Sequence, residues 1–243
     1  MLRVHSVETF GTHEGPGIRL VIFLQGCNIR CLYCHNPDTQ ALTTDSTKNM
    51  TTEQILELLE KERPYFKRGG GLTVSGGEPT LQADGLIELF TSAKAAGFHT
   101  CLDTNGTIVS PTTKKLYDLT DLVLLDVKHI NDDWHRKLTG AGNANTLAMA
   151  KYRESTGKPM WLRYVLVPGW SDQPEYLEEW GKYFADYQTV EQVEILPYHT
   201  LGVYKYEGLG MDYTLNNVQP PSPAKVDQAK NIFEKYLKNV FIQ

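Results

Sequence analysis

Three cysteines lie close together near the N-terminus, at positions 27, 31 and 34 of a 243-residue chain. Thiolates bind zinc and the irons of iron–sulfur clusters, and a closed zinc site or a fully ligated 4Fe-4S cluster takes four protein ligands. The spacing Cys27-x3-Cys31-x2-Cys34 supplies three of them from one short loop. One iron of a cluster held in this way would stay open to a chelating ligand, such as the amine and carboxylate of an amino acid.

A zinc site is the alternative, with His35 or a distant residue as the fourth ligand, and spacing alone leaves it open. The fourth cysteine, Cys101, lies within an apolar run and is expected to be a buried, unreactive thiol. Clustered thiols are poorly spaced for a disulfide framework in a chain of this length. They indicate metal binding in a reducing compartment, so we expect the cytoplasm.

Further candidate groups follow apolar runs at the points where predicted strands end. Adjacent glycines let the backbone approach a ligand closely, although a glycine pair is more often a tight turn. Charged groups directly after buried runs bind ligands or form structural ion pairs, and a lone histidine is usually structural. The candidates are Gly76, Gly77 and Glu78, then Asp103, then Asp126, Val127 and Lys128, and finally His199.

Strand-like runs alternate with helical patterns along the chain, which is typical of a parallel α/β sheet because parallel neighbours need crossover connections. Periodicity does not distinguish a doubly wound sheet from an incomplete barrel, and both collect chemistry at the carboxyl ends of the strands. The predicted strands are 20–24, 72–75, 98–103, 121–126, 160–167 and 193–197. The predicted helices are 52–66, 84–96, 145–155, 174–186 and 222–237.

The composition narrows the class of protein. The chain has 24 basic and 29 acidic residues, a formal charge of -5, which argues against nucleic-acid binding through a broad basic surface. No apolar run approaches the ~20 residues of a membrane span, and the first residues lack the apolar core of a secretory signal. We expect one domain over residues 1–243 that neither binds nucleic acid nor enters a membrane.

The cysteine motif resembles the signature of the radical S-adenosylmethionine (SAM) superfamily. In the run GCNIRCLYCHN, Tyr33 occupies the place of the aromatic residue that packs near the adenine of SAM. Gly76-Gly77-Glu78 resembles the GGE motif, which contacts the amino group of SAM. The resemblance implies an incomplete (β/α)6 TIM-type barrel, a 4Fe-4S cluster on Cys27, Cys31 and Cys34, and SAM on the open iron.

The same resemblance implies further cofactor contacts. An aspartate and a lysine of the superfamily lie beside the SAM ribose and carboxylate, and Asp126 and Lys128, with Val127 between them, occupy those places. Asp103 would lie in the pocket or at a cation site, and His199 would reach a ribose hydroxyl. His35, which follows Cys34, would lie near the adenine through its backbone.

At the N-terminus, the run GTHEGPGIR over residues 11–19 is similar to the G-T-x-D-G-P-G-I-R stretch of glycyl-radical-enzyme activases. The resemblance implies an oxidoreductase that cleaves SAM reductively to methionine and 5′-deoxyadenosine and places a glycyl radical on another protein. Glu14 stands where the family often has aspartate, in the loop thought to meet the target peptide. Pro79 stands where some members have alanine.

The implied protein substrate is pyruvate formate-lyase, through its glycine-bearing C-terminal loop, with reduced flavodoxin as the electron donor and the activase as a monomer. Activases of other glycyl radical enzymes commonly carry a ferredoxin-like insert with more cysteines, which a chain of four cysteines lacks. The alternatives are such an activase, a radical SAM enzyme acting on a small molecule, such as 7-carboxy-7-deazaguanine synthase, and a non-catalytic zinc or electron-transfer protein.

Overall fold

The computed structural model describes residues 1–67 and 69–243, which form two compact units. The first unit contains residues 1–28 and 39–124, and the second contains residues 29–38 and 125–243. The cysteine-bearing segment therefore contributes to both units. The organisation of the chain as a single domain stays a prediction.

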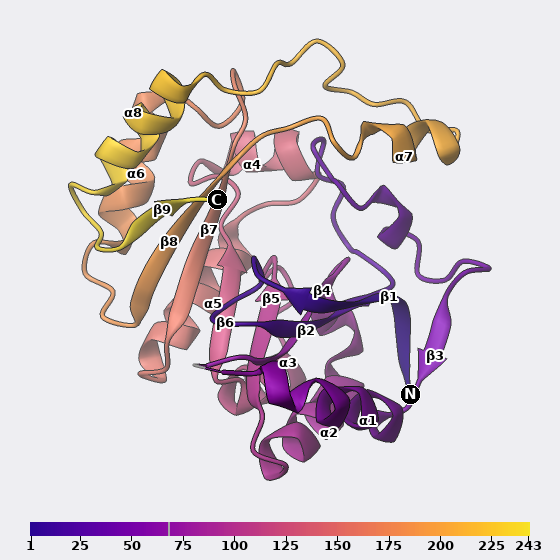
Figure 1. Ribbon diagram of the computed structural model, residues 1–243. Coiled ribbons are helices and arrows are strands. Elements are labelled where there is room, and N and C mark those ends of the chain that lie inside the picture. The colour runs from indigo at the N-terminus through magenta and orange to yellow at the C-terminus, as the bar shows by residue number, and fades with distance from the viewer. Residues whose placement is uncertain (68) are drawn as a thin grey trace. The chain divides into compact units, whose positions relative to one another are not determined.

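The first unit is built on parallel strands with an antiparallel hairpin at their edge (Figure 1). Strand β2 pairs in parallel with β4, and β4 with β5, whereas β1 pairs antiparallel with β2 and β3. Because Leu24 is in register with Gly76, the ends of β2 and β4 lie at the same edge. The strands are β1 (Leu2–Gly11), β2 (Arg19–Leu24), β3 (Lys48–Met50), β4 (Gly71–Gly76) and β5 (His99–Thr104), followed by β6 (Leu122–Asp126) at the boundary of the units.

Three helices lie along these strands: α1 (Thr52–Glu62), α2 (Ala83–Ala95) and α3 (Pro111–Leu119). Helix α1 begins at a capping box, in which the side chain of Thr51 accepts from the backbone of Gln54 and the Gln54 side chain accepts in return. Helix α2 buries the apolar stripe expected from its spacing, Leu86, Leu89, Phe90 and Ala93.

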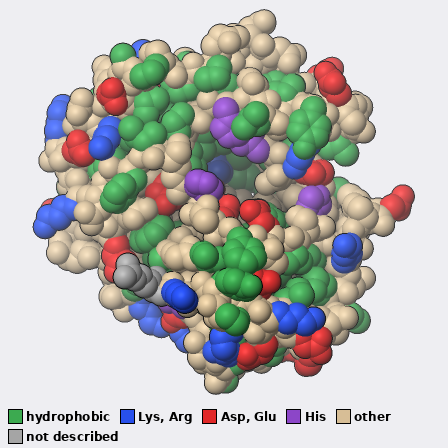
Figure 2. All heavy atoms as spheres, viewed as in Figure 1, with side chains coloured by type: hydrophobic (Ala, Val, Ile, Leu, Met, Phe, Trp, Pro, Cys, Tyr) green, Lys and Arg blue, Asp and Glu red, His purple; other side chains and the backbone are tan. Residues whose placement is uncertain are grey.

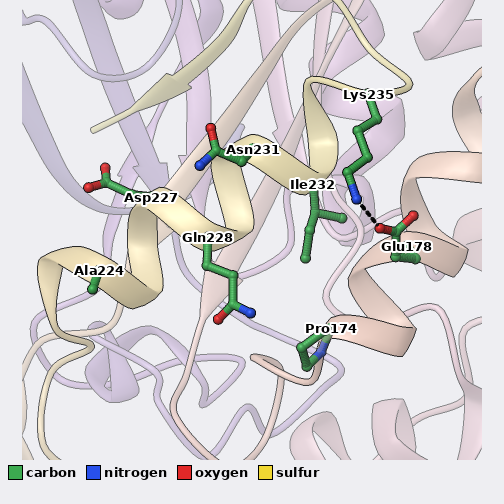
Figure 3. Close-up of a pocket in the computed structure, with 8 residues that line it drawn as sticks. All are labelled: Pro174, Glu178, Ala224, Asp227, Gln228, Asn231, Ile232 and Lys235. Atoms are coloured by element: carbon green, nitrogen blue, oxygen red, sulfur yellow. Dashed lines mark hydrogen bonds and ion pairs between the residues drawn. The ribbon is translucent and has the colours of Figure 1, made fainter.

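The second unit contains β7 (Met160–Leu166), β8 (Val190–Pro197) and β9 (Val240–Ile242), which pair in parallel in that order. Its helices are α4 (Asp132–Thr139), α5 (Ala144–Ser155), α6 (Pro174–Phe184), α7 (Val203–Gly208) and α8 (Pro223–Phe233). An aromatic core joins α6, α8 and β7, with the rings of Trp180 and Phe233 4.7 Å apart and those of Tyr164 and Phe233 5.4 Å apart. Residues of α6 and α8 line a pocket, and the Lys235–Glu178 ion pair lies in its lining (Figure 3).

The six predicted strands are confirmed as β2, β4, β5, β6, β7 and β8, with small shifts at their ends. Two predicted helices are too long. The helix expected over 52–66 ends at Glu62, because Pro64 lies in a 3₁₀ turn and cannot continue the hydrogen-bond ladder. The helix expected over 222–237 ends at Phe233.

On the face shown in Figure 2, acidic and basic side chains are interspersed among polar and apolar ones, so the residues described on this face form no broad patch of a single charge sign. Within the part of the chain that the structure describes, none of the helices combines the length and apolarity needed to cross a membrane.

Candidate functional site

In the first unit, the start of the cysteine segment is held against the glycine turn after β4. The N–H of Glu78 donates to the carbonyl of Gly26 at 2.7 Å, and the N–H of Cys27 donates to the carbonyl of Gln40 at 3.2 Å. A Cβ on Gly77 would lie 2.1 Å from the Gly26 oxygen. Glycine is therefore required at position 77 by the close approach of two backbone segments, and this approach fixes the residue that precedes Cys27.

The Glu78 carboxylate is fully buried and bonded within the first unit. One oxygen accepts from the Thr104 hydroxyl at 2.7 Å and from the Thr80 backbone and hydroxyl, and the other accepts from the Asn105 N–H at 2.8 Å. Burial raises the pKa of Glu78, although these hydrogen bonds lower it in part. The side chain thus ties the end of β4 to the loop after β5, and the backbone of the glycine turn is the part suited to a cofactor contact.

A second network in the first unit involves residues that sequence patterns did not single out. The Asn28 amide, next to Cys27, donates to the Thr107 hydroxyl at 2.7 Å and accepts from the Asn105 amide at 3.2 Å. Of the predicted residues, Asp103 accepts from the Ser75 hydroxyl at 2.6 Å. Asn28 carried no sequence signal beyond its place between two cysteines.

In the second unit, residues 29–38 are anchored by main-chain bonds to the end of α4. The N–H of Arg30 donates to the Thr139 carbonyl at 2.7 Å, and that of Leu32 donates to the Leu138 carbonyl at 2.9 Å. Cys31 and Leu32 also pack against an apolar cluster formed by Tyr33, Leu138, Val167, Tyr198, Tyr206, Tyr213 and Leu215. The segment is therefore ordered without belonging to a long helix or strand.

Tyr33 lies beside the predicted Asp126–Lys128 pair. The Lys128 ammonium is 3.0 Å from an Asp126 oxygen and 5.7 Å from the centre of the Tyr33 ring. Burial lowers the pKa of Lys128, but attraction to Asp126 outweighs it and the pKa is raised well above its usual value. The buried Tyr33 hydroxyl has no hydrogen-bond partner among the residues described, so it is a polar atom to which a ligand could bond.

The backbone of Val127 is already engaged in the second unit: its N–H donates to the Arg163 carbonyl at 3.1 Å and its carbonyl accepts from the Trp180 indole at 3.2 Å. His35 and His199 stack with ring centres 3.9 Å apart, and the His35 Nε2–H donates to the His199 carbonyl at 3.0 Å. Burial lowers the pKa of both imidazoles, which favours the neutral forms that stack without repulsion.

The cysteine sulfurs at positions 27, 31 and 34 are suited to hold a cluster through three thiolates. Cys27, Cys31 and Cys34 are partly exposed, whereas Cys101 is buried, as predicted. Burial raises the pKa of Cys101 to about 11, so it stays protonated at neutral pH. Cys27 belongs to the first unit and the other two to the second, and in residues 1–67 and 69–243 no three His, Cys, Asp or Glu side chains form a ready-made metal site.

Comparisons with known proteins agree with this chemistry. The Radical SAM superfamily profile matches residues 21–180. The pyruvate formate-lyase-activating enzyme of Streptococcus mutans is 46% identical over 98% of this chain and 94% of its own length. The pyruvate formate-lyase 1-activating enzyme of Escherichia coli K12 is 44% identical over 96% of each chain.

Solved structures support the fold. A domain of a pyruvate-formate lyase-activating enzyme from Bacteroides vulgatus aligns with a TM-score of 0.61 at 23% identity, over 72% of this chain and 99% of that one. SuiB of Streptococcus suis, bound to its precursor peptide SuiA, aligns with a TM-score of 0.72 at 16% identity, over 93% of this chain and 48% of that one. The predicted fold class, an α/β incomplete TIM-type barrel of parallel strands, is confirmed. The chain belongs to the radical SAM superfamily, whose members use a 4Fe-4S cluster and SAM, and within it to the pyruvate formate-lyase-activating enzymes.

Proposed function

We propose that this protein activates pyruvate formate-lyase by generating a glycyl radical on it. The observation that carries the proposal is the 46% identity to an enzyme of that name over 98% of the chain, with the cysteine and glycine motifs in place. When bound, the reduced cluster and SAM supply the reductive cleavage that gives methionine and 5′-deoxyadenosine. The protein's task is to hold these groups, exclude water and present the target glycine.

The three clustered cysteines, Cys27, Cys31 and Cys34, would hold the cluster. The partial exposure of their thiols supports this role, because a ligand loop must reach its metal. The backbone of Gly76 and Gly77 would receive the amino group of SAM, and the absence of Cβ atoms lets this turn pack closely against the backbone of Leu24 and Gly26, which fixes its position. Glu78 would act by supporting that turn, since its carboxylate is engaged by protein donors.

Residues of the second unit would hold the rest of SAM. The charged pair of Asp126 and Lys128 would orient its carboxylate and ribose, and the Tyr33 hydroxyl offers a free polar atom beside that pair. His199 would bond a ribose hydroxyl, and the backbone of His35 would face the adenine. Val127 would contribute through its position between the charged residues, and Asp103 would line the pocket or a cation site.

The proposal also covers the electron donor, the oligomeric state, the protein substrate and the cellular compartment. Reduced flavodoxin would deliver the electron, the activase would work as a monomer, and the glycine-bearing C-terminal loop of pyruvate formate-lyase would be the substrate. The clustering of the three thiols supports a reducing compartment, the cytoplasm.

The test begins with protein purified without oxygen. Iron and sulfide analysis should give one 4Fe-4S cluster, and the reduced enzyme with SAM and pyruvate formate-lyase should give a glycyl radical by electron paramagnetic resonance. Cys27→Ala, Cys31→Ala and Cys34→Ala should each abolish SAM cleavage, while the control Cys101→Ala should retain it.

Zinc in place of iron, or full activity in any one of the three cysteine variants, would refute the cluster assignment. No radical on pyruvate formate-lyase, together with a radical on another glycyl radical enzyme, would reassign the protein substrate.

A further inference from the structure

The segment after β8, residues 199–206, folds over the second half of the cysteine segment within the second unit. It runs from His199 into the first residues of α7. It contacts four residues of the cysteine segment, Cys34, His35, Asn36 and Asp38. The two segments lie more than 160 positions apart in the sequence. Their contact is therefore a product of the fold and has no local sequence signal.

The approach at His35 is close enough to require a glycine. A Cβ on Gly202 would lie 2.8 Å from the His35 Cα and 3.0 Å from the His35 oxygen, so position 202 has no room for a side chain. On the other side of this contact, the His199 ring stacks on the His35 ring. One side of His35 is thus packed against residues 199–202.

Lys205 holds the residues that follow. Its ammonium donates to the Asn36 side-chain oxygen at 2.9 Å and forms an ion pair with Asp38 at 3.1 Å. Both members of the ion pair are partly buried, with side chains 22% and 28% exposed, so the contact is less screened by solvent than a fully exposed pair.

Tyr206 bonds directly to the last cysteine of the motif. Its hydroxyl donates to the Cys34 carbonyl at 3.0 Å, and the residue is only 5% exposed. The Tyr206 ring packs edge-on against the Tyr213 ring, with the ring centres 4.9 Å apart. Because packing fixes the ring, the hydroxyl is held where the carbonyl needs it.

We propose that residues 199–206 form a clasp that fixes the backbone of Cys34 and His35, and that Tyr206 is a positioning residue for the third cluster ligand. The inference rests on the proposed function, which makes Cys34 a ligand. Partners that orient metal ligands from outside the coordination sphere contribute to metal affinity, because a ligand held in place returns to its metal faster than a mobile one. The clasp would therefore slow the loss of iron.

The test is Tyr206→Phe in the full-length protein with its cluster assembled, because the ring is kept and only the hydroxyl is removed. A net hydrogen bond of about 0.5–1.5 kcal/mol corresponds to iron loss to a chelator about two- to tenfold faster than in the wild type. Hydrogen exchange should also rise at the backbone amides of residues 34–36 and of Asp38. If Tyr206→Phe does not fold, Lys205→Met, which removes the bonds to Asn36 and Asp38, takes its place with the same expectation.

The matched control is Tyr213→Phe, which removes a buried tyrosine hydroxyl bond from the same apolar cluster without touching the cysteine segment. It should lower thermal stability to a similar extent and leave the rate of iron loss unchanged. An unchanged rate in Tyr206→Phe, or equal acceleration in both variants, would overturn the clasp. Full iron retention in Cys34→Ala would instead overturn the ligand assignment, so failure of the clasp and of the proposed function can be told apart.

Discussion

Gly77→Ala tests whether the glycine turn after β4 positions the cluster loop. A Cβ at this position would lie 2.1 Å from the Gly26 oxygen and 2.6 Å from the Gly26 carbonyl carbon. Both are backbone atoms, so no side-chain rotation relieves the overlap. The turn and the residue before Cys27 must move apart, and the bond from the Glu78 N–H to Gly26 is then stretched or lost.

Forcing a methyl group into a packed site costs about 1–3 kcal/mol, and the lost hydrogen bond adds about 0.5–1.5 kcal/mol. We expect the free energy of unfolding to fall by about 2–4 kcal/mol. The measurement is urea unfolding of the protein without cluster, combined with iron content after anaerobic reconstitution. Because the displacement occurs next to Cys27, iron content should fall as well.

Gly97→Ala is the control in the same unit. Gly97 has φ +80°, and no described heavy atom lies within 4 Å of a Cβ built on it, so alanine there costs about 1–2 kcal/mol through backbone strain alone. This variant should be destabilised yet bind its full complement of iron. Normal iron content in Gly77→Ala, or equal loss of iron in both variants, would refute the positioning role of the turn.

Three further changes probe other parts of the chain. Arg19→Met should lower the free energy of unfolding, measured by urea titration, by about 2–4 kcal/mol. The buried Arg19 guanidinium donates to the Gly69 carbonyl and the Thr73 hydroxyl, and both acceptors would lose this donor in the variant. Glu78→Gln should lower the free energy of unfolding by about 1–3 kcal/mol, because the hydrogen-bond partners of the carboxylate described above are all donors and one of them would face the amide NH2 of glutamine. If the variant instead lost SAM binding, measured by equilibrium dialysis, at unchanged stability, the structural role of Glu78 would be contradicted. Burial lowers the pKa of His129 from 6.5 to about 4, so between these pH values the unfolded chain binds one proton more than the folded protein. The free energy of unfolding should therefore rise with pH from about 4 to 6.5, and its slope against pH should be smaller in His129→Asn. An equal slope in both proteins would rule out His129 as the source of the pH dependence.

The strands could be predicted because a parallel sheet buries both faces of each strand and so requires continuous apolar runs. Strand β2 is an example, with five of its six residues buried. Strand β1 was missed because residues 7–10 are exposed and residues 2–7 intersperse polar with apolar side chains instead of forming a continuous apolar run. Helix α4 was missed because its buried residues include His135 and Thr139, which do not read as an apolar stripe.

The residues of the candidate site also fall into those that the sequence predicts and those that it does not. The cysteines and the glycine pair could be found because their chemistry depends on residue type at short spacing. The donors around Glu78 could not be identified as such, because Thr104, the last residue of β5, and Asn105, which follows it, lie more than 25 positions away and are ordinary polar residues by type. Tyr206 gave no signal at all, since its bond to Cys34 spans 172 positions.

The cysteine segment shows why such distant residues matter. Between the end of β2 and the 3₁₀ turn at Pro37–Thr39 the chain forms no helix or strand, so its backbone groups need partners from elsewhere. Those partners are backbone groups of Thr39, Gln40 and Glu78 in the first unit, and of Leu138 and Thr139, with the Tyr206 hydroxyl, in the second. A loop that is irregular by sequence is therefore held by the fold at both ends, and substitutions far from the motif should loosen the cluster without altering any of its ligands.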